Sequence, residues 1–189
     1  MWHLSFFFLF FFILTSPNYK TFTSTATSLD ILDQTCRTCA DRSIVFSYNV
    51  CLNSLQTIPV CHATNLQGLA LIAMELALEN ATTSISTINK LLTSGTLDPF
   101  ALACLEDCLK LYSSAVVTLI DATGAFLTGE YGIANVWLTA VMEASTTCEE
   151  GFSEREEMEC PLKKENYNLF QLCDIALCII NLLSLHVNS

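Results

Sequence analysis

The amino-acid sequence predicts an all-α protein: an up-and-down four-helix bundle that is preceded by a short N-terminal helical hairpin and stapled by disulfides. Three observations lead to this prediction. Apolar and small residues recur at helical spacing through four long segments that are joined by short connections. The sustained apolar–polar alternation of a half-buried strand is missing from the sequence. Ten cysteines in 189 residues, all of them after position 35, are typical of a disulfide-linked protein from an oxidising compartment.

The first residues have the pattern of a secretory signal peptide. An apolar run from Leu4 to Leu14 is shorter than the roughly 20 residues that a membrane-spanning helix needs. A Ser/Thr-rich stretch follows it, with small residues at positions 24–26 where cleavage would occur. We therefore expect residues 1–26 to be removed as a signal peptide, although the stretch before the run lacks a basic residue. An uncleaved membrane anchor is the alternative.

The remaining chain would divide into a helical hairpin at residues 27–60 and a bundle at residues 61–189. It would carry 7 basic and 19 acidic side chains, a formal charge of 7 − 19 = −12. Such an acidic chain repels the phosphates of nucleic acids, which excludes them as partners. We also expect no membrane partner once the signal has been removed.

Residues 29–57 are typical of two short helices that are broken near Ser43. One face of each helix would be apolar: Leu29, Leu32, Cys36 and Cys39 on the first, and Tyr48, Cys51, Leu52 and Leu55 on the second. Isolated helices shorter than about 12 residues are marginal in water. A bridge between Cys36 and Cys51 would span 51 − 36 = 15 positions and contribute roughly 3 kcal/mol in the chain-entropy model. Buried free thiols are the alternative.

Cys36 and Cys39 also have the two-residue spacing of a zinc site. A second pair at matching spacing is missing, and His62 and His186, the histidines after residue 26, lie far from the first pair in the sequence. A redox motif with this spacing would need a strand–helix context that the sequence does not offer. Structural disulfides are therefore favoured, and we expect no metal site.

Residues 57–64 are a connector in which Pro59 interrupts the helix and Thr64 is the expected N-cap of the next one. That next helix is predicted from Leu66 to Leu92. Its buried stripe combines apolar and small residues: Leu66, Leu69, Ala73, Ala77, Ala81, Ser84, Ile88 and Leu91. Its wet face is polar: Gln67, Glu75, Glu79, Thr83, Ser86 and Lys90. Gly95 is the expected stop signal.

Asn80-Ala81-Thr82, within this predicted helix, is the only Asn-x-Ser/Thr sequon of the chain. Asn80 is therefore a candidate glycosylation site. Its helical context weighs against use, so both outcomes stay open.

Residues 101–152 are typical of two helices that fold back on each other across a Gly-containing turn. Apolar and small residues recur on one face of each: Cys104, Cys108, Leu111, Ala115, Leu119, Ala122 and Phe126, then Ile133, Val136, Trp137, Ala140 and Ala144. We place Cys108 in the first helix and Cys148 just past the end of the second. A disulfide between them would close 148 − 108 = 40 positions and contribute about 4 kcal/mol in the chain-entropy model. Cys104, one turn before Cys108, could compete for Cys148.

Residues 149–164 are dense in charge and contain Gly151 and Pro161, which is typical of a solvated connector. A calcium loop is the alternative, but the Asp-x-Asp-x-Asp-Gly spacing is missing. Residues 166–187 are apolar on a wide face: Phe170, Leu172, Cys173, Ala176, Leu177, Ile179, Ile180 and Leu183. Because Asp174 and Asn181 give this segment a polar side, we predict the fourth bundle helix rather than a removable lipid-anchor signal.

The sequence lacks the residue patterns of known catalytic sites. A Gly-x-Ser-x-Gly elbow, a phosphate-binding loop and a His-Glu-x-x-His motif are all missing. We expect no enzymatic activity, no catalytic residue and no cofactor. A rigid bundle loses little conformational entropy on docking, which suits a protein inhibitor. A secreted protein that binds a small ligand without inhibiting an enzyme is the alternative.

Four runs, in the expected order, resemble the plant pectin methylesterase inhibitor and invertase inhibitor family. They are Leu66-Gln67-Gly68-Leu69, Cys108-Leu109-Lys110-Leu111-Tyr112, Ala134-Asn135-Val136-Trp137-Leu138-Thr139-Ala140 and Thr147-Cys148-Glu149-Glu150-Gly151-Phe152. The first run is also similar to the branch that includes a plane-tree pollen allergen. The resemblance covers the whole mature chain and implies the four-helix bundle with disulfides Cys36–Cys51 and Cys108–Cys148. It also implies secretion to the plant cell wall or apoplast, or delivery to the vacuole.

The resemblance leaves the other six cysteines without assigned partners. They are Cys39, Cys61, Cys104, Cys160, Cys173 and Cys178. Extra disulfides within the chain and bridges between chains both stay open.

The resemblance further implies one of two protein partners. Pectin methylesterase inhibitors lay a bundle face across the substrate cleft of the enzyme, whereas invertase inhibitors insert a Pro-Lys-Phe wedge from the turn before the third bundle helix. This chain has Gly129-Glu130-Tyr131-Gly132-Ile133-Ala134 at that turn. We therefore predict pectin methylesterase as the target, with acid invertase as the alternative. The candidate contact residues lie on the second and third bundle helices and the turn between them: Thr118, Asp121, Glu130, Tyr131 and Thr139.

Overall fold

The computed structural model describes residues 30–95, 97–155 and 158–187. The expected signal peptide lies outside the described residues, as does Leu29. The regular elements of the described ranges are all helical. They are, in order, α2 (Ile31–Ala40), α3 (Tyr48–Leu55), the 3₁₀ helix η1 (Pro59–Ala63), α4 (Leu66–Thr93), α5 (Pro99–Leu127), α6 (Tyr131–Ser153) and α7 (Lys163–Val187). The prediction of an all-α fold is confirmed.

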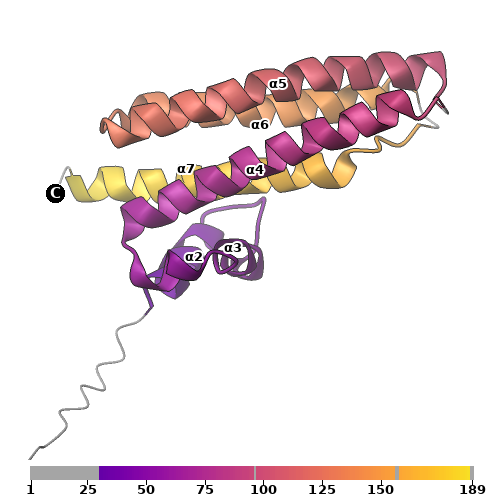
Figure 1. The fold of residues 1–189 in the computed structure, drawn as a ribbon. Helices are drawn as coiled ribbons and strands as arrows, with labels where there is room; N and C mark the ends of the chain where they lie inside the picture. Colours follow the sequence, from indigo (N-terminus) through magenta and orange to yellow (C-terminus); the bar gives the residue numbers. More distant parts are fainter. Residues whose placement is uncertain (1–29, 96, 156–157, 188–189) are drawn as a thin grey trace, which may run out of the picture.

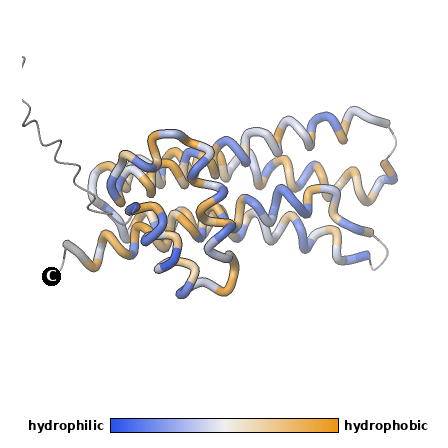
Figure 2. Tube along the Cα trace, turned by 90° about the horizontal axis from the view of Figure 1, so that it is seen from below, coloured by the Kyte–Doolittle hydropathy of each residue, from blue (hydrophilic) through white to orange (hydrophobic). Residues whose placement is uncertain are grey.

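The four long helices, α4 to α7, form an up-and-down bundle (Figure 1). Each helix packs against the two that neighbour it around the bundle: α4 against α5 and α7, and α6 against α5 and α7. Apolar and polar residues alternate along every one of them in Figure 2, as amphipathic helices require. In α4 the buried positions include Ala70, Ala73, Ala77 and Ala81, and these small side chains allow the neighbouring helices to approach closely.

The start of α4 differs from the prediction. The N-cap is Asn65, whose Oδ1 accepts a hydrogen bond from the backbone N–H of Gly68 at 3.0 Å, and not Thr64. The side chain of Thr64 instead packs on the first turn of the helix. A Cβ atom at position 68 would lie only 1.7 Å from the Thr64 Oγ1. This close approach explains why the position is a glycine.

The end of α6 also differs from the prediction. Cys148 lies inside the helix, which continues to Ser153, so residues 149–153 are not part of the charged connector. Cys148 and Phe152 are both buried and are one turn apart on the inner face. Packing of that face extends the helix past Gly151 and outweighs the low helix propensity of glycine. The last helix likewise begins at Lys163, three residues before the predicted start at Asn166.

Helical periodicity predicted the exposed face of α4 correctly but the buried face of α6 incorrectly in part. All six residues of the predicted wet face of α4 are exposed. On α6, however, Ile133 and Val136 were expected to be buried and are 47% and 68% exposed. The inner face of α6 is instead centred on Ala134, Leu138 and Val141. Ile133 and Val136 therefore extend into solvent beside the turn.

The long apolar helix α7 packs inside the bundle. From Lys163 to Leu185 it is long and apolar enough to cross a membrane by length and composition alone. Ile175, Ile179 and Ile180 are completely buried, however, and the helix contacts both α4 and α6. Its apolarity is thus explained by its place in the protein core.

The hairpin of α2 and α3 packs on the side of the bundle formed by α4 and α7 (Figure 1). The Oγ of Ser43, between the two short helices, donates a hydrogen bond to Oδ2 of Asp174 at 2.7 Å. The carbonyl oxygen of Val45 accepts from the Tyr167 hydroxyl at 3.1 Å and from Nε2 of Gln171 at 3.2 Å. All three partners lie on α7, so the hairpin leaves the outer faces of α5 and α6 uncovered.

Candidate functional site

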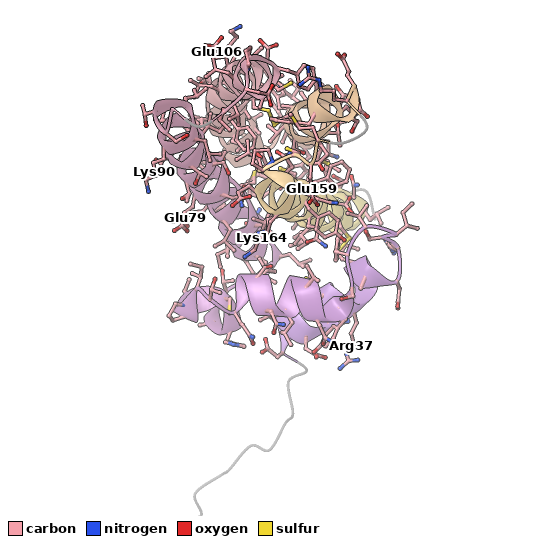
Figure 3. The ribbon with its side chains drawn as sticks, turned by 90° about the vertical axis from the view of Figure 1, so that its right-hand side faces the viewer. Arg37, Glu79, Lys90, Glu106, Glu159 and Lys164 are labelled. Carbon is pink, nitrogen blue, oxygen red and sulfur yellow. A yellow bond between two sulfur atoms is a disulfide. The ribbon has the colours of Figure 1, made fainter. Side chains whose placement is uncertain are left out.

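The candidate site is the outer face of α5 and α6 with the turn that joins them. Figure 3 shows that Glu106 on α5 lies on the far side of the molecule from Arg37 in the hairpin. A disulfide joins Cys108 of α5 to Cys148 of α6, with the Cα atoms 5.0 Å apart. This pair is the one that the resemblance implies, and it holds the two helices side by side at the end away from the turn. The surface is therefore presented on rigid elements.

The turn from α5 to α6 is tight. Gly129 has a φ of 81°, in the left-handed region that favours glycine, so the chain can reverse directly after the C-cap residue Thr128. The backbone N–H of Glu130 donates to the carbonyl oxygen of Ala125 at 2.8 Å. The ring of Tyr131 packs against that of Phe126, with the centroids 5.4 Å apart. The aromatic side chain of the turn is thus half-buried on the bundle and does not protrude.

The five predicted contact residues take up different positions on this surface. Asp121, Glu130 and Thr139 are exposed. Thr118 is half-buried, and its hydroxyl donates to the carbonyl oxygen of Ser114 at 3.0 Å within α5. Tyr131 is half-buried against Phe126. The structure therefore exposes three of the five residues and leaves part of the other two accessible.

Sequence reasoning missed the apolar part of this surface. Five large apolar side chains of these two helices are exposed: Val117, Ile120 and Leu127 on α5, and Ile133 and Val136 on α6. Helical periodicity placed Ile133 and Val136 in the core because it reports which residues share a face and not which face is covered. Exposed apolar side chains on these two helices could contribute to a surface that meets a protein partner if they lie in one patch.

The charge of the α5–α6 segment is strongly negative. Residues 99–153 contain seven acidic side chains and one basic side chain, Lys110, for a net charge of 1 − 7 = −6. The Nζ of Lys110 is paired with Oδ1 of Asp107 at 2.9 Å. The apolar residues at the turn therefore lie in an acidic field that would steer the protein toward a basic partner surface.

A buried polar network at the opposite end of the bundle holds the helices in register. The Tyr112 hydroxyl donates to Oδ1 of Asn166 at 2.7 Å, and Nδ2 of Asn166 donates to Oε2 of Glu149 at 2.8 Å. These residues belong to α5, α7 and α6, so one amide connects three helices. Burial raises the pKa of Tyr112 above its ordinary value of 10.0, which keeps the hydroxyl protonated and able to donate.

The remaining cysteines are sorted by the structure into disulfides and thiols. Cys36 pairs with Cys51, as the resemblance implies, and Cys39 pairs with Cys178 of α7. The two cysteines with zinc-site spacing therefore belong to separate disulfides. The unpaired cysteines are Cys61, Cys104, Cys160 and Cys173, and Cys104 does not displace Cys108 as the partner of Cys148.

Three comparisons place this chain among known proteins. The family described as "Plant invertase/pectin methylesterase inhibitor" matches residues 30–179. A protein of Platanus orientalis named "Putative invertase inhibitor" is 36% identical over 82% of this chain and 91% of its own length. The "Pectinesterase inhibitor" of Actinidia deliciosa is 30% identical over 71% of this chain and 72% of its own length.

The fold is also similar to that of a solved structure. It is a mutant form of a pectin methylesterase inhibitor from Arabidopsis, with a TM-score of 0.68 and 23% sequence identity, covering 79% of this chain and 96% of the other. At that identity the likeness supports the bundle architecture alone. The family match spans α2 to α6 and most of α7. The chain therefore belongs to the plant invertase/pectin methylesterase inhibitor family, whose members are inhibitor proteins and not enzymes.

Proposed function

We propose that this protein is secreted and inhibits a plant pectin methylesterase by laying the outer face of α5 and α6 across the substrate cleft of the enzyme. The shape of the α5–α6 turn is the observation that favours pectin methylesterase over invertase as the target. Tyr131 is packed back against Phe126, and the residue before it, Glu130, is acidic and exposed. A turn of this shape suits contact along a face better than insertion into a deep sugar pocket.

The charge of the surface supports the same target. Pectin methylesterase converts methyl esters of a polysaccharide into carboxylates, so its cleft has to accommodate a chain that carries negative charge. An α5–α6 segment with a net charge of 1 − 7 = −6 is complementary to such a cleft. Sucrose, the substrate of invertase, is uncharged and gives an acidic inhibitor face no comparable advantage.

Acid invertase is the second candidate target. One specific observation favours it: proteins of Platanus orientalis and Platanus acerifolia, each 36% identical to this chain over 156 residues, are both named "Putative invertase inhibitor". The identity to the pectinesterase inhibitor of Actinidia deliciosa is lower, at 30%.

An inhibition assay against both enzymes tests the proposal. The purified chain without residues 1–26 is titrated into a pectin methylesterase and into an acid invertase, each at acidic and at neutral pH. We expect loss of pectin methylesterase activity that is complete near one equivalent of inhibitor, with invertase unaffected. Inhibition of invertase alone would show that acid invertase, and not pectin methylesterase, is the target. Full activity of both enzymes under all conditions would overturn the proposed function.

A further inference from the structure

We propose that Asn80 carries an N-linked glycan whose first sugars occupy the cleft between the helical hairpin and the bundle. The inference rests on passage through the secretory pathway, which the proposed function also requires. It does not depend on which enzyme is the target.

The geometry of Asn80 suits attachment. Asn80 is half-buried in the middle of α4, and its side-chain Oδ1 is buried without a hydrogen-bond partner among the described residues. Its Nδ2 makes no hydrogen bond to the described part of the chain and is not one of the buried unpartnered atoms, so it is accessible to solvent. The amide therefore points its oxygen inward and directs outward the nitrogen to which a sugar is attached.

Asn80 is one of the residues that line a cleft of about 600 Å³. The cleft lies where α3 meets α4 and α7, and its polar lining consists mainly of amides and hydroxyls: Asn53, Ser54, Thr57, Thr83, Asn168 and Gln171. Glu79 is the one charged side chain among the described residues of the lining, and in Figure 3 it lies on the side of α4 toward the hairpin. Val50, Leu76 and Leu172 supply apolar patches. Hydroxyl and amide partners beside small apolar patches match the chemistry of a neutral sugar, which has polar edges and C–H faces.

The sugar donor for the glycosylation of Asn80 is an oligosaccharide linked to a polyprenyl diphosphate. The bond from the sugar C1 to the diphosphate oxygen breaks and a bond from C1 to Nδ2 forms. The polyprenyl diphosphate leaves with the electron pair of the broken bond, and the amide releases one proton to solvent. Thr82 provides the hydroxyl residue of the sequon and is exposed. Because the modification takes place on the unfolded chain, the helical conformation of α4 is no barrier to it.

A glycan in this cleft would contact the hairpin through Asn53 and Ser54 and the bundle through Asn168. The helix α3 packs directly on α4 and α7, but its disulfide, Cys36–Cys51, leads to α2 and not to the bundle. The sugars would therefore add polar contacts to the packing that α3 already makes with α4 and α7. We expect them to slow the local opening of α3 away from the bundle.

Protein secreted from cultured plant cells tests the proposal with two matched variants. Thr82→Ser keeps the sequon and Thr82→Ala removes it, and position 82 does not line the cleft. The intact mass is measured before and after treatment with peptide N-glycosidase A, and the modified residue is located by peptide mapping. We expect a glycan on Asn80 in the native protein and in Thr82→Ser, and none in Thr82→Ala.

Hydrogen exchange tests whether the glycan sits in the cleft. We expect the amides of α3 to exchange about threefold faster in Thr82→Ala than in Thr82→Ser. An unmodified Asn80 in the secreted protein would overturn the proposal, as would equal exchange of α3 in the two variants. Neither readout uses inhibition of an enzyme, so a failure here is distinct from a failure of the proposed function.

Discussion

Cys39 of the hairpin and Cys178 of α7 are joined by a disulfide across 139 positions of the sequence. The bond fastens the end of α2 to the last bundle helix, while the hydrogen bond from Ser43 to Asp174 fixes the loop that follows α2. The disulfide implied by the family resemblance for this region, Cys36–Cys51, closes only the hairpin itself. Attachment of the hairpin to the bundle thus depends on a bridge beyond the pairs that the resemblance implies.

Loss of this bridge should destabilise the protein strongly. Two other disulfides shorten this loop. Cys108–Cys148 removes 40 positions, and the route from Cys39 through Cys36 to Cys51 replaces 51 − 39 = 12 positions by 39 − 36 = 3, so the effective loop is 139 − 40 − 9 = 90 positions. We expect the double variant Cys39→Ser with Cys178→Ser to lose about 3–5 kcal/mol of the free energy of unfolding. Urea unfolding measures the loss, with Cys104→Ser, which removes an unpaired thiol, as the control. A double variant as stable as this control would show that the bridge contributes nothing.

The buried hydrogen-bond network around Asn166 should contribute less to the free energy of unfolding than the Cys39–Cys178 disulfide does. Tyr112→Phe keeps the ring but removes the donor to Oδ1 of Asn166, which leaves a buried acceptor without its partner. We expect a loss of about 1–2 kcal/mol in the free energy of unfolding. Ser113→Ala is the matched control, because that hydroxyl is exposed and, among the described residues, donates only to the carbonyl oxygen of Leu109 within α5. If both variants unfold at the same urea concentration as the native protein, the network does not stabilise the bundle.

Stability should fall at alkaline pH. Burial raises the pKa of the Cys160 thiol from 9.0 to about 12 and raises the pKa of Tyr112 above 10.0. Because the folded protein holds these protons more tightly than the unfolded chain, their full contribution to stability is present below about pH 9. It is lost as the pH rises through 9 and toward 12. Urea unfolding between about pH 7 and about pH 10, followed by the fluorescence of Trp137, should show this decline. Cys160→Ala should decline less steeply, and an identical slope would contradict the assignment to Cys160.

The three disulfides and four free thiols predict how many cysteines react in the native and in the unfolded protein. Four cysteines are unpaired, of which Cys61, Cys160 and Cys173 are buried and Cys104 is half-buried. We expect iodoacetamide to modify Cys104 alone in the native protein, slowly, because burial raises the pKa of its thiol. All four should react after unfolding without a reductant. Mass spectrometry reads both counts, and a different number of labels in the unfolded protein would refute the disulfide pattern.

The proposed inhibitory surface is tested by its most exposed apolar residue. Val136 on α6 is 68% exposed, so Val136→Glu should leave the free energy of unfolding almost unchanged. If the residue lies in the interface, inhibition of the target enzyme should weaken by roughly tenfold or more. Val60→Glu, at a 55% exposed position in η1, is the matched control and should inhibit normally. Equal inhibition by both variants would show that the interface does not include this part of α6.

Several helix boundaries could not be obtained from local signals. Thr64 and Asn65 are both good N-cap residues, and the choice of Asn65 depends on the packing of Thr64 against Gly68. Gly151 and the charges around it indicated a loop after Cys148. The helix continues because Phe152 is buried on the same inner face as Cys148. In both places tertiary packing outweighs a preference of less than about 1 kcal/mol.

The sequence by itself determined the class of fold and the course of the chain. Helical periodicity, the stop at Gly95 and the polar face of α4 depend only on residues a few positions apart, and the structure agrees with them. Tertiary structure alone decided which faces meet. It pairs Cys39 with Cys178, joins Tyr112 to Asn166, and leaves Val136 in solvent. Periodicity identifies the residues that share a face, but the partner of each face is set by how all the helices pack together.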